Sequence, residues 1–160
     1  MRRSLFAALL VLLAAPQIAH AAGADAALIV FSSNRADGVR ELYTVDRDGS
    51  GEHRITFNDV VERQPVFSPD GNRIAFAGLR DGIWDIYTID AEGDERPRRL
   101  TSNGAINHRP SWSPDGRLIA FDSETGGQTD VFVAPWTGGE QQPLITGPGD
   151  QDSPSWGTAP

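Results

Sequence analysis

Short runs of alternating apolar and polar residues recur along the chain, separated by turn-forming residues. Aligning Phe31 with Phe76 and Phe121 gives a period of 45 residues. Three further positions keep this spacing to within one residue: Tyr43, Tyr87 and Phe132; Gly49, Gly93 and Gly138; and Thr56, Thr101 and Thr146. A period of about 40 to 50 residues built from short strands predicts β-propeller blades, not helical repeats or a single sandwich.

The middle copy shows how one repeat forms a four-stranded antiparallel blade. We expect strands near 64–67, 72–77, 84–89 and 98–101, each bounded by turn residues. The predicted fold class is therefore all-β, a partial β-propeller of about three four-stranded antiparallel blades after an N-terminal signal peptide. The predicted boundaries are 1–21 for the signal peptide and 22–160 for the repeats, with copies near 27–57, 64–101 and 109–146 and a terminal strand at 153–156.

The turn between the first two strands has the same sequence in two copies. It consists of Ser68, Pro69, Asp70 and Gly71, and again of Ser113, Pro114, Asp115 and Gly116. Proline fixes φ at the first central position, aspartate accepts local backbone hydrogen bonds, and glycine tolerates a positive φ. We expect these residues to be structural.

The first 21 residues have the layout of a secretory signal. Arg2 and Arg3 precede an apolar run over 5–13, and residues 19–21 read Ala-His-Ala, the small-x-small pattern before a cleavage site. An uncleaved anchor is the alternative, but the apolar run is about half of the roughly 20 residues that span a bilayer. The prediction is a periplasmic or secreted protein without membrane insertion after cleavage.

Charge and cysteine content exclude several kinds of chemistry. The chain has 14 basic and 22 acidic residues, and only two of the basic ones precede residue 22. Nucleic acid is not expected as a partner, because its binding needs clustered positive charge. There is no cysteine, which excludes thiol catalysis, thiolate zinc sites and disulfides.

Two segments carry the signature of a known repeat. Residues 68–76 read Ser-Pro-Asp-Gly-Asn-Arg-Ile-Ala-Phe, and 113–121 read Ser-Pro-Asp-Gly-Arg-Leu-Ile-Ala-Phe. They resemble the WD40-like repeat of the TolB propeller family, over about 27–156. Blades in the propeller domains of prolyl-oligopeptidase-type peptidases are similar. The TolB resemblance implies a periplasmic, non-catalytic binding or scaffold protein of the Tol–Pal kind, which contacts a peptidoglycan-associated lipoprotein or another envelope protein and needs no cofactor.

The number of blades raises the question of ring closure. Propellers close with about four to eight blades, and the family resembled here has six, together with an N-terminal α/β domain that this sequence does not contain. The first copy starts at its second strand, whereas 153–156 correspond to a first strand alone. A homodimer completing a six-bladed ring is one expectation. An open half-ring and a degenerate fragment without present function are the alternatives.

Candidate metal and catalytic groups mostly have structural explanations. The segment 46–52 resembles a calcium loop, but the bidentate glutamate is replaced by Phe57, and the segment aligns with turns in the other copies. His53 and His108 belong to different blades without metal-ligand spacing. No G-x-S-x-G motif is present. No metal site and no catalytic residue are predicted, and the repeated carboxylates Glu41, Asp85 and Asp130 are expected to tie strands together.

The variable connections between blades are the expected binding surface. They span 57–63, 102–109 and 147–152 and are predicted to gather on one rim near the channel mouth. Arg63, His108 and Arg109 supply positive charge there and would receive a carboxylate-bearing ligand or peptide. An ordinary solvated rim without a ligand is the structural alternative. The alternative from another class is a propeller enzyme, a lyase or hydrolase acting on a sugar polymer or peptide through these Arg and His side chains. Convergence of the three in one pocket would favour that alternative.

Overall fold

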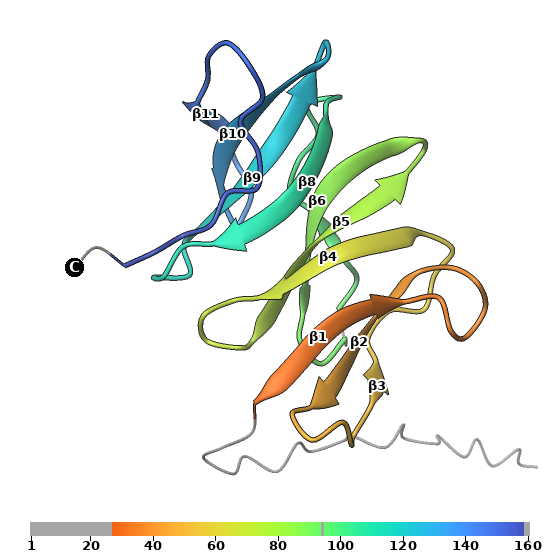
Figure 1. Cartoon of the computed structure of the whole chain (residues 1–160). Helices are drawn as coiled ribbons and strands as arrows, with labels where there is room; N and C mark the ends of the chain where they lie inside the picture. Colours follow the sequence, from red (N-terminus) through yellow and green to blue (C-terminus); the bar gives the residue numbers. More distant parts are fainter. Residues whose placement is uncertain (1–26, 94, 159–160) are drawn as a thin grey trace, which may run out of the picture.

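The chain folds into three antiparallel sheets that stack face to face in chain order (Figure 1). The computed structural model describes residues 27–93 and 95–158, so the predicted signal peptide lies outside the described part. All eleven elements in this part are strands. Over the same residues, no helix has the length and apolar character needed to cross a membrane. The predicted all-β architecture of three blades is confirmed.

Each sheet is a meander of sequential strands and is called a blade below. Blade 1 consists of β1 (Leu28–Ser33), β2 (Glu41–Asp46) and β3 (His53–Arg54). Blade 2 consists of β4 (Val61–Phe67), β5 (Arg73–Arg80), β6 (Ile83–Asp90) and β7 (Arg98–Arg99). Blade 3 consists of β8 (Ile106–Trp112), β9 (Leu118–Thr125), β10 (Gln128–Pro135) and β11 (Gln142–Ile145). Blade 1 therefore has one strand fewer than its neighbours, at the position of β4 and β8.

The repeated aromatic positions form one stacked pair in every blade. Phe76 on β5 lies directly opposite Tyr87 on β6, and their ring centroids are 5.7 Å apart. The pairs Phe31–Tyr43 and Phe121–Phe132 repeat this arrangement at 5.7 and 6.1 Å. Stacked aromatic pairs across neighbouring strands stabilise a sheet and fix its register. The repeated aromatic positions in the sequence thus mark residues that lie opposite each other on the second and third strands of a blade.

The hydrophobic core lies between the blades. One cluster joins blades 1 and 2 and consists of Leu42, Ile55, Ile74, Phe76, Tyr87 and Ile89. A second joins blades 2 and 3 and consists of Ala75, Ala77, Ile86, Leu100, Trp112, Ile119, Phe121 and Ala134. Because both faces of blade 2 are covered, five of the eight residues in each of its second and third strands are buried. Each blade depends on its neighbours for burial.

The two Ser-Pro-Asp-Gly turns have nearly identical geometry. Ser68 donates its hydroxyl to Asp70 Oδ1 at 2.6 Å and accepts the Arg73 N–H at 3.0 Å, while Gly71 adopts a φ of 74°. Ser113 bonds Asp115 and Leu118 at 2.6 and 2.9 Å. The serine bond to each aspartate is the main cause that lowers the pKa of Asp70 and Asp115. Both carboxylates are committed to the turn.

The first strands begin earlier than the sequence pattern predicts. β4 starts at Val61 and β8 at Ile106, so Arg63, His108 and Arg109 lie in strands and not in connecting loops. Both strands contain a bulge, after Arg63 in β4 and after His108 in β8, where Gln64 and Arg109 adopt φ values of 55° and 51°. The sequence pattern missed the first half of each strand, because the bulge and its proline break the alternation of apolar and polar positions.

One turn glycine provides a test of how closely blades 1 and 2 approach. Gly93 has a φ of 80°, and a Cβ at this position would lie 2.7 Å from the Ile55 carbonyl oxygen. Gly49, at the same repeat position, has a φ of 84° and open space around it. We expect Gly93→Ala to lower the free energy of unfolding by about 2 to 4 kcal/mol, and Gly49→Ala by about 1 kcal/mol. Urea unfolding followed by tryptophan fluorescence measures both. Equal effects would contradict the proposed backbone contact.

Candidate binding site on the first strands

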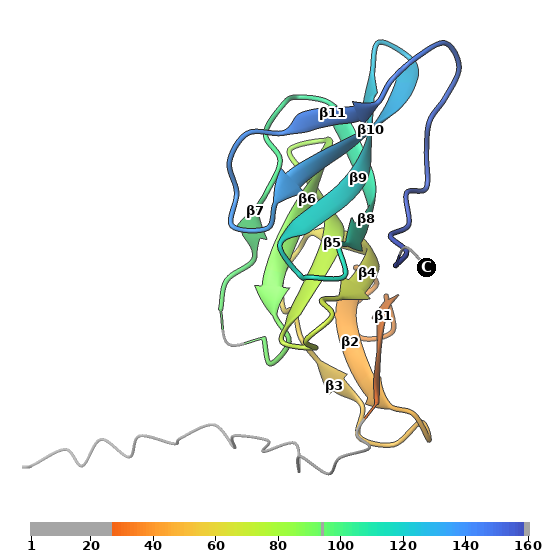
Figure 2. The same cartoon turned by 90° about the vertical axis from the view of Figure 1, so that its left-hand side faces the viewer.

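Arg63 and His108 meet on the ring of Trp84, a residue that the sequence pattern did not single out. Arg63 projects from β4 with its guanidinium carbon 5.4 Å from the Trp84 ring centroid. His108 projects from β8 with its ring centroid 5.0 Å away, at an angle of 46°. Together with Arg109 and Asp122 these residues form the first-strand cluster. Figure 2 shows β4, β8 and the C-terminal segment along one edge of the molecule.

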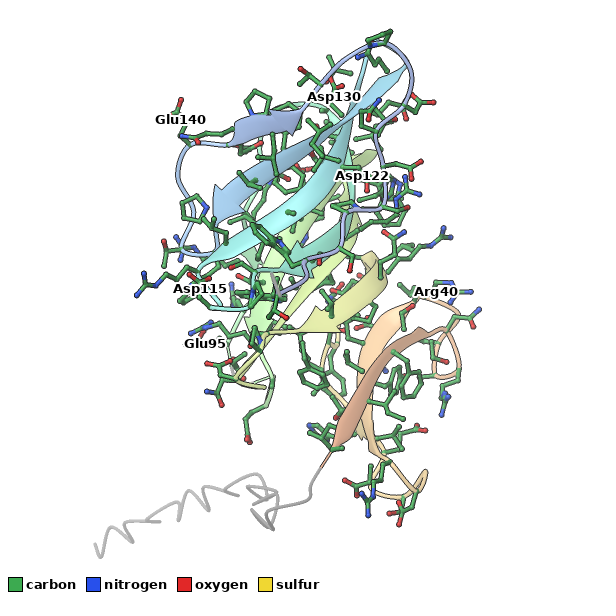
Figure 3. The ribbon with its side chains drawn as sticks, turned by 60° about the vertical axis from the view of Figure 1, so that its left-hand side comes forward. Arg40, Glu95, Asp115, Asp122, Asp130 and Glu140 are labelled. Atoms are coloured by element: carbon green, nitrogen blue, oxygen red, sulfur yellow. The ribbon has the colours of Figure 1, made fainter. Side chains whose placement is uncertain are left out.

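Arg109 is occupied by carboxylates and differs in this respect from Arg63. Its Nε and Nη2 donate to the two carboxylate oxygens of Asp122 at 2.9 and 3.0 Å, and Asp152 lies 3.6 Å from Nη2. The bond to Asp122 is the main cause that raises the pKa of Arg109. Asp122 lies on β9 on the side where the C-terminal segment passes (Figure 3). Arg109 therefore links β8, β9 and this segment.

Arg63 is the accessible cation of the cluster. Its side chain is exposed, and within the described part of the chain no carboxylate lies within ion-pair distance of it. A guanidinium over an indole face is held by a cation–π contact while its N–H groups stay available. Arg63 and the partly exposed Trp84 thus offer a positive charge beside an aromatic surface.

Burial favours the neutral form of His108. Its pKa is lowered, chiefly by burial, while nearby Asp122 raises it and Arg109 and Arg63 lower it. A neutral imidazole offers one N–H donor and one acceptor nitrogen. The two cavities described for the chain do not include Arg63, His108 or Arg109 in their linings. The structure therefore joins two of the three predicted residues, and it gives Arg109 a different contact.

A buried polar network with two carboxylates lies between blades 1 and 2. Glu62 is fully buried and accepts hydrogen bonds from the Thr56 hydroxyl at 2.6 Å and the Asn58 amide at 2.9 Å. Glu41 is also fully buried and accepts the Asn58 N–H at 2.8 Å, with Arg54 at 3.3 Å. Burial raises the pKa of Glu62 to about 7; the Thr56 and Asn58 bonds oppose this shift, and the charge of Glu41 adds to it.

The equivalent network between blades 2 and 3 contains an amide in place of one acid. Asp85 accepts the Thr101 hydroxyl at 2.6 Å and lies 2.5 Å from Arg99. Asn107 occupies the position of Glu62 and donates to Asp85 at 3.4 Å and to Asn103 at 3.0 Å. Two of the three repeated carboxylates, Glu41 and Asp85, make contacts of the kind expected for a structural role. Glu41 and Asp85 tie neighbouring segments together inside the stack.

The remaining predicted positions lie apart from this cluster. Asp130 is half-buried on β10 and accepts the Gln128 amide at 3.1 Å. The calcium-like segment is a tight turn between β2 and β3, closed by a bond from the Gly49 N–H to the Asp46 carbonyl at 2.9 Å. His53 lies on β3, opposite Thr44. No group of three or more metal-ligating side chains occurs among the described residues.

The buried polar residues Glu62 and Asn107 were not among the site residues predicted from the sequence. Glu62, Asn107 and Gln151 share one repeat position, which is polar in all three copies. A polar residue repeated at one position of a strand is a signal of a buried network and could have identified it. Trp84 had no such signal, because Arg40 and Thr129 stand at its position in the other copies.

The comparisons with known proteins agree with this architecture. The family model described as the TolB beta propeller domain matches residues 60–159. The Tol-Pal system protein TolB of Desulfosudis oleivorans is 38% identical over 51 residues, which are 32% of this chain and 12% of that protein. The match thus spans about an eighth of that relative.

Two solved structures have the same arrangement of blades. A protein assigned as TolB in Agrobacterium tumefaciens is 29% identical with a TM-score of 0.70, over 76% of this chain and 43% of that one. TolB from Acinetobacter baumannii is 27% identical with a TM-score of 0.61, over 78% and 31%. Since the family model covers more than half of the sequence, the chain belongs to the TolB beta propeller domain family.

Proposed function

We propose that this chain is a non-catalytic, protein-binding propeller of the bacterial envelope that works with the Tol–Pal system. The family membership and a relative named as a Tol-Pal system protein support this assignment. The signal-like N-terminus supports a periplasmic or secreted location. The partner is a peptidoglycan-associated lipoprotein or another envelope protein.

The accessible Arg63 beside Trp84 is the observation that carries the binding function. Arginine and tryptophan are among the residue types enriched at the energetic centres of protein interfaces. The guanidinium would pair with a carboxylate of the partner, and the Trp84 ring would pack against an apolar group next to it. The cluster thus fits a protein segment with a carboxylate close to an apolar side chain.

The same geometry supports binding more than catalysis. Arg109 is bound to Asp122 and Asp152, so it is not available to stabilise a developing negative charge. His108 stacks on Trp84, and no nucleophile is hydrogen-bonded to it among the contacts described. A general base needs a reacting group within hydrogen-bond reach, and an acyl-transfer site needs an activated nucleophile.

Affinity capture tests the proposed partner. The full chain, purified as its host processes it, is used to capture proteins from an envelope extract, and the peptidoglycan-associated lipoprotein is quantified by mass spectrometry. We expect its capture and an approximately tenfold loss with Arg63→Glu, because charge reversal at an interface centre disrupts pairing. Arg117→Glu is the matched control, since Arg117 is an exposed arginine of the turn between β8 and β9.

Two outcomes would refute the proposal. Absence of the lipoprotein from the captured fraction would remove the Tol–Pal partner. Equal loss with Arg63→Glu and Arg117→Glu would show that general charge, and not the first-strand cluster, governs capture.

A further inference from the structure

Blade 1 exposes an apolar face that is buried in the other two blades. Ile29 on β1 is 53% exposed, whereas Ile74 and Ile119, at the same repeat position, are fully buried. Ile74 packs against blade 1, and Ile119 packs against blade 2. Ile29 therefore stands at the position that packs against the preceding blade in blades 2 and 3, but within the described residues no blade covers it.

Blade 3 exposes the complementary face. Ile145 on β11 is 50% exposed, whereas Ile55 and Leu100, at the equivalent positions, are 3% and 6% exposed. Ile55 belongs to the cluster that holds Ile74, and Leu100 to the cluster that holds Ile119. By the same pattern, Ile145 would pack against an isoleucine at the repeat position of Ile29, Ile74 and Ile119 in a following blade. Beside it lies a groove of about 280 Å³ lined by Leu144, Ile145, Trp156 and neighbouring residues.

The segment 150–156 is already docked on blade 3 in the manner of a first strand. The Gln151 N–H bonds the Thr129 carbonyl at 2.7 Å, as Glu62 bonds Arg40 at 2.9 Å. Ser153 adopts a φ of 56°, close to the values of the bulge residues in β4 and β8. Trp156 donates its indole N–H to the Ser111 carbonyl at 3.0 Å.

The Trp156 contact has its own counterpart one blade earlier. Trp112 donates its indole N–H to the Val66 carbonyl at 3.3 Å, from the equivalent position on β8. All three features of the segment 150–156 therefore repeat those of a first strand. No strand pairs with this segment among the described residues, whereas β4 and β8 pair with β5 and β9.

β1, in contrast, is a second strand that has no first strand beside it in the described part of the chain. It pairs with β2 on one side, and its other edge carries no strand within the described residues. The corresponding strands β5 and β9 are paired on both sides. Unpaired strand edges and bare apolar sheet faces favour pairing with another chain. The segment 150–156 lacks a second strand, and β1 lacks a first.

We propose that a second copy of this chain supplies both, so that 150–156 of one copy and β1–β3 of the other form one composite four-stranded blade. The registers of β4–β5 and β8–β9 place Trp156 opposite Ile29 and Asp152 opposite Ser32. Ile29 then packs in the groove beside Ile145. The same contact forms twice about a two-fold axis and gives a closed ring of six blades. This assembly does not depend on which protein the first-strand cluster binds.

Site-specific cross-linking tests the register directly, because the chain has no cysteine of its own. The double variant Ser32→Cys with Asp152→Cys is treated with a short bis-maleimide and analysed on a denaturing gel. We expect a band of two copies. Ser50→Cys with Asp152→Cys is the control, since Ser50 lies in the exposed turn between β2 and β3, and it should remain a single copy. Equal cross-linking of both variants, or of neither, would overturn the register.

Sedimentation equilibrium of the unmodified protein tests the stoichiometry. We expect a mass of two copies at high micromolar concentration. Ile29→Glu should weaken association by about 100-fold, because it buries an unpaired charge in the contact. Its exposed position leaves the fold of each copy intact, which circular dichroism checks. A mass of one copy, a mass that keeps growing beyond two, or an unchanged Ile29→Glu dimer would each refute the composite blade. The lipoprotein capture can succeed or fail independently of these results.

Discussion

Glu62→Gln is expected to stabilise the protein above neutral pH by up to about 3 kcal/mol, because a difference of one between the folded and unfolded pKa corresponds to about 1.4 kcal/mol. The pKa of Glu62 is raised from an ordinary value of 4.5 to about 7, chiefly by burial. The folded state therefore binds more protons than the unfolded state between these two values, so the free energy of unfolding falls as the pH rises through this window. An uncharged amide removes this loss.

The repeat supplies a matched control for this prediction. Asn107 stands at the same position between blades 2 and 3, and its amide lies 3.4 Å from Asp85. Asn107→Asp would place a second carboxylate there and should lower stability at high pH more than at low pH, the opposite of Glu62→Gln. Urea unfolding of both variants and the wild type at pH values on either side of the window measures the differences. A Glu62→Gln variant that is less stable than the wild type at high pH would contradict the assignment.

Trp112→Ala is expected to lower the free energy of unfolding by about 3 to 5 kcal/mol, the usual cost of removing a large buried aromatic side chain. Trp112 is 6% exposed and packs in the cluster between blades 2 and 3. Its indole N–H also bonds the Val66 carbonyl at 3.3 Å. The substitution leaves a cavity in the apolar contact that holds these two sheets together.

Trp112→Phe separates packing from hydrogen bonding. The preceding copy has Phe67 at this position, so a phenyl ring fits the repeat. The variant should lose about 1 kcal/mol, mainly from the bond to Val66. Equilibrium unfolding in urea followed by far-UV circular dichroism compares the two. If Trp112→Ala and Trp112→Phe destabilise equally, the hydrogen bond and not the packing carries the contact.

Much of the fold could be predicted because its signals are local. The Ser-Pro-Asp-Gly turns form from residues within five positions of one another, and the structure shows the same hydrogen bonds in both copies. The repeated aromatic positions predicted the blades because Phe76 and Tyr87 pair on neighbouring strands of one meander. Such features depend on short stretches of sequence and change little with the surroundings.

The binding site could be predicted only in part. Arg63 and His108 were chosen for their charge in variable segments, but their common contact with Trp84 depends on how β4, β6 and β8 pack. Arg109 looked equivalent to Arg63, and the structure binds it to Asp122, a residue of a different strand. Whether a charge is free or paired is decided by residues distant in sequence.

The sequence by itself determined the all-β class, the length of the repeat and the turns, because these follow from alternation, turn chemistry and residues that are close along the chain. Only the tertiary structure decided which polar side chains are buried and which cations stay accessible. Glu62 and Glu41 are 21 positions apart, and although each stands at a repeated polar position, the sequence does not show that the two carboxylates meet in one network. The physical reason is that burial and charge pairing belong to the contact between two blades, and no single blade contains that contact.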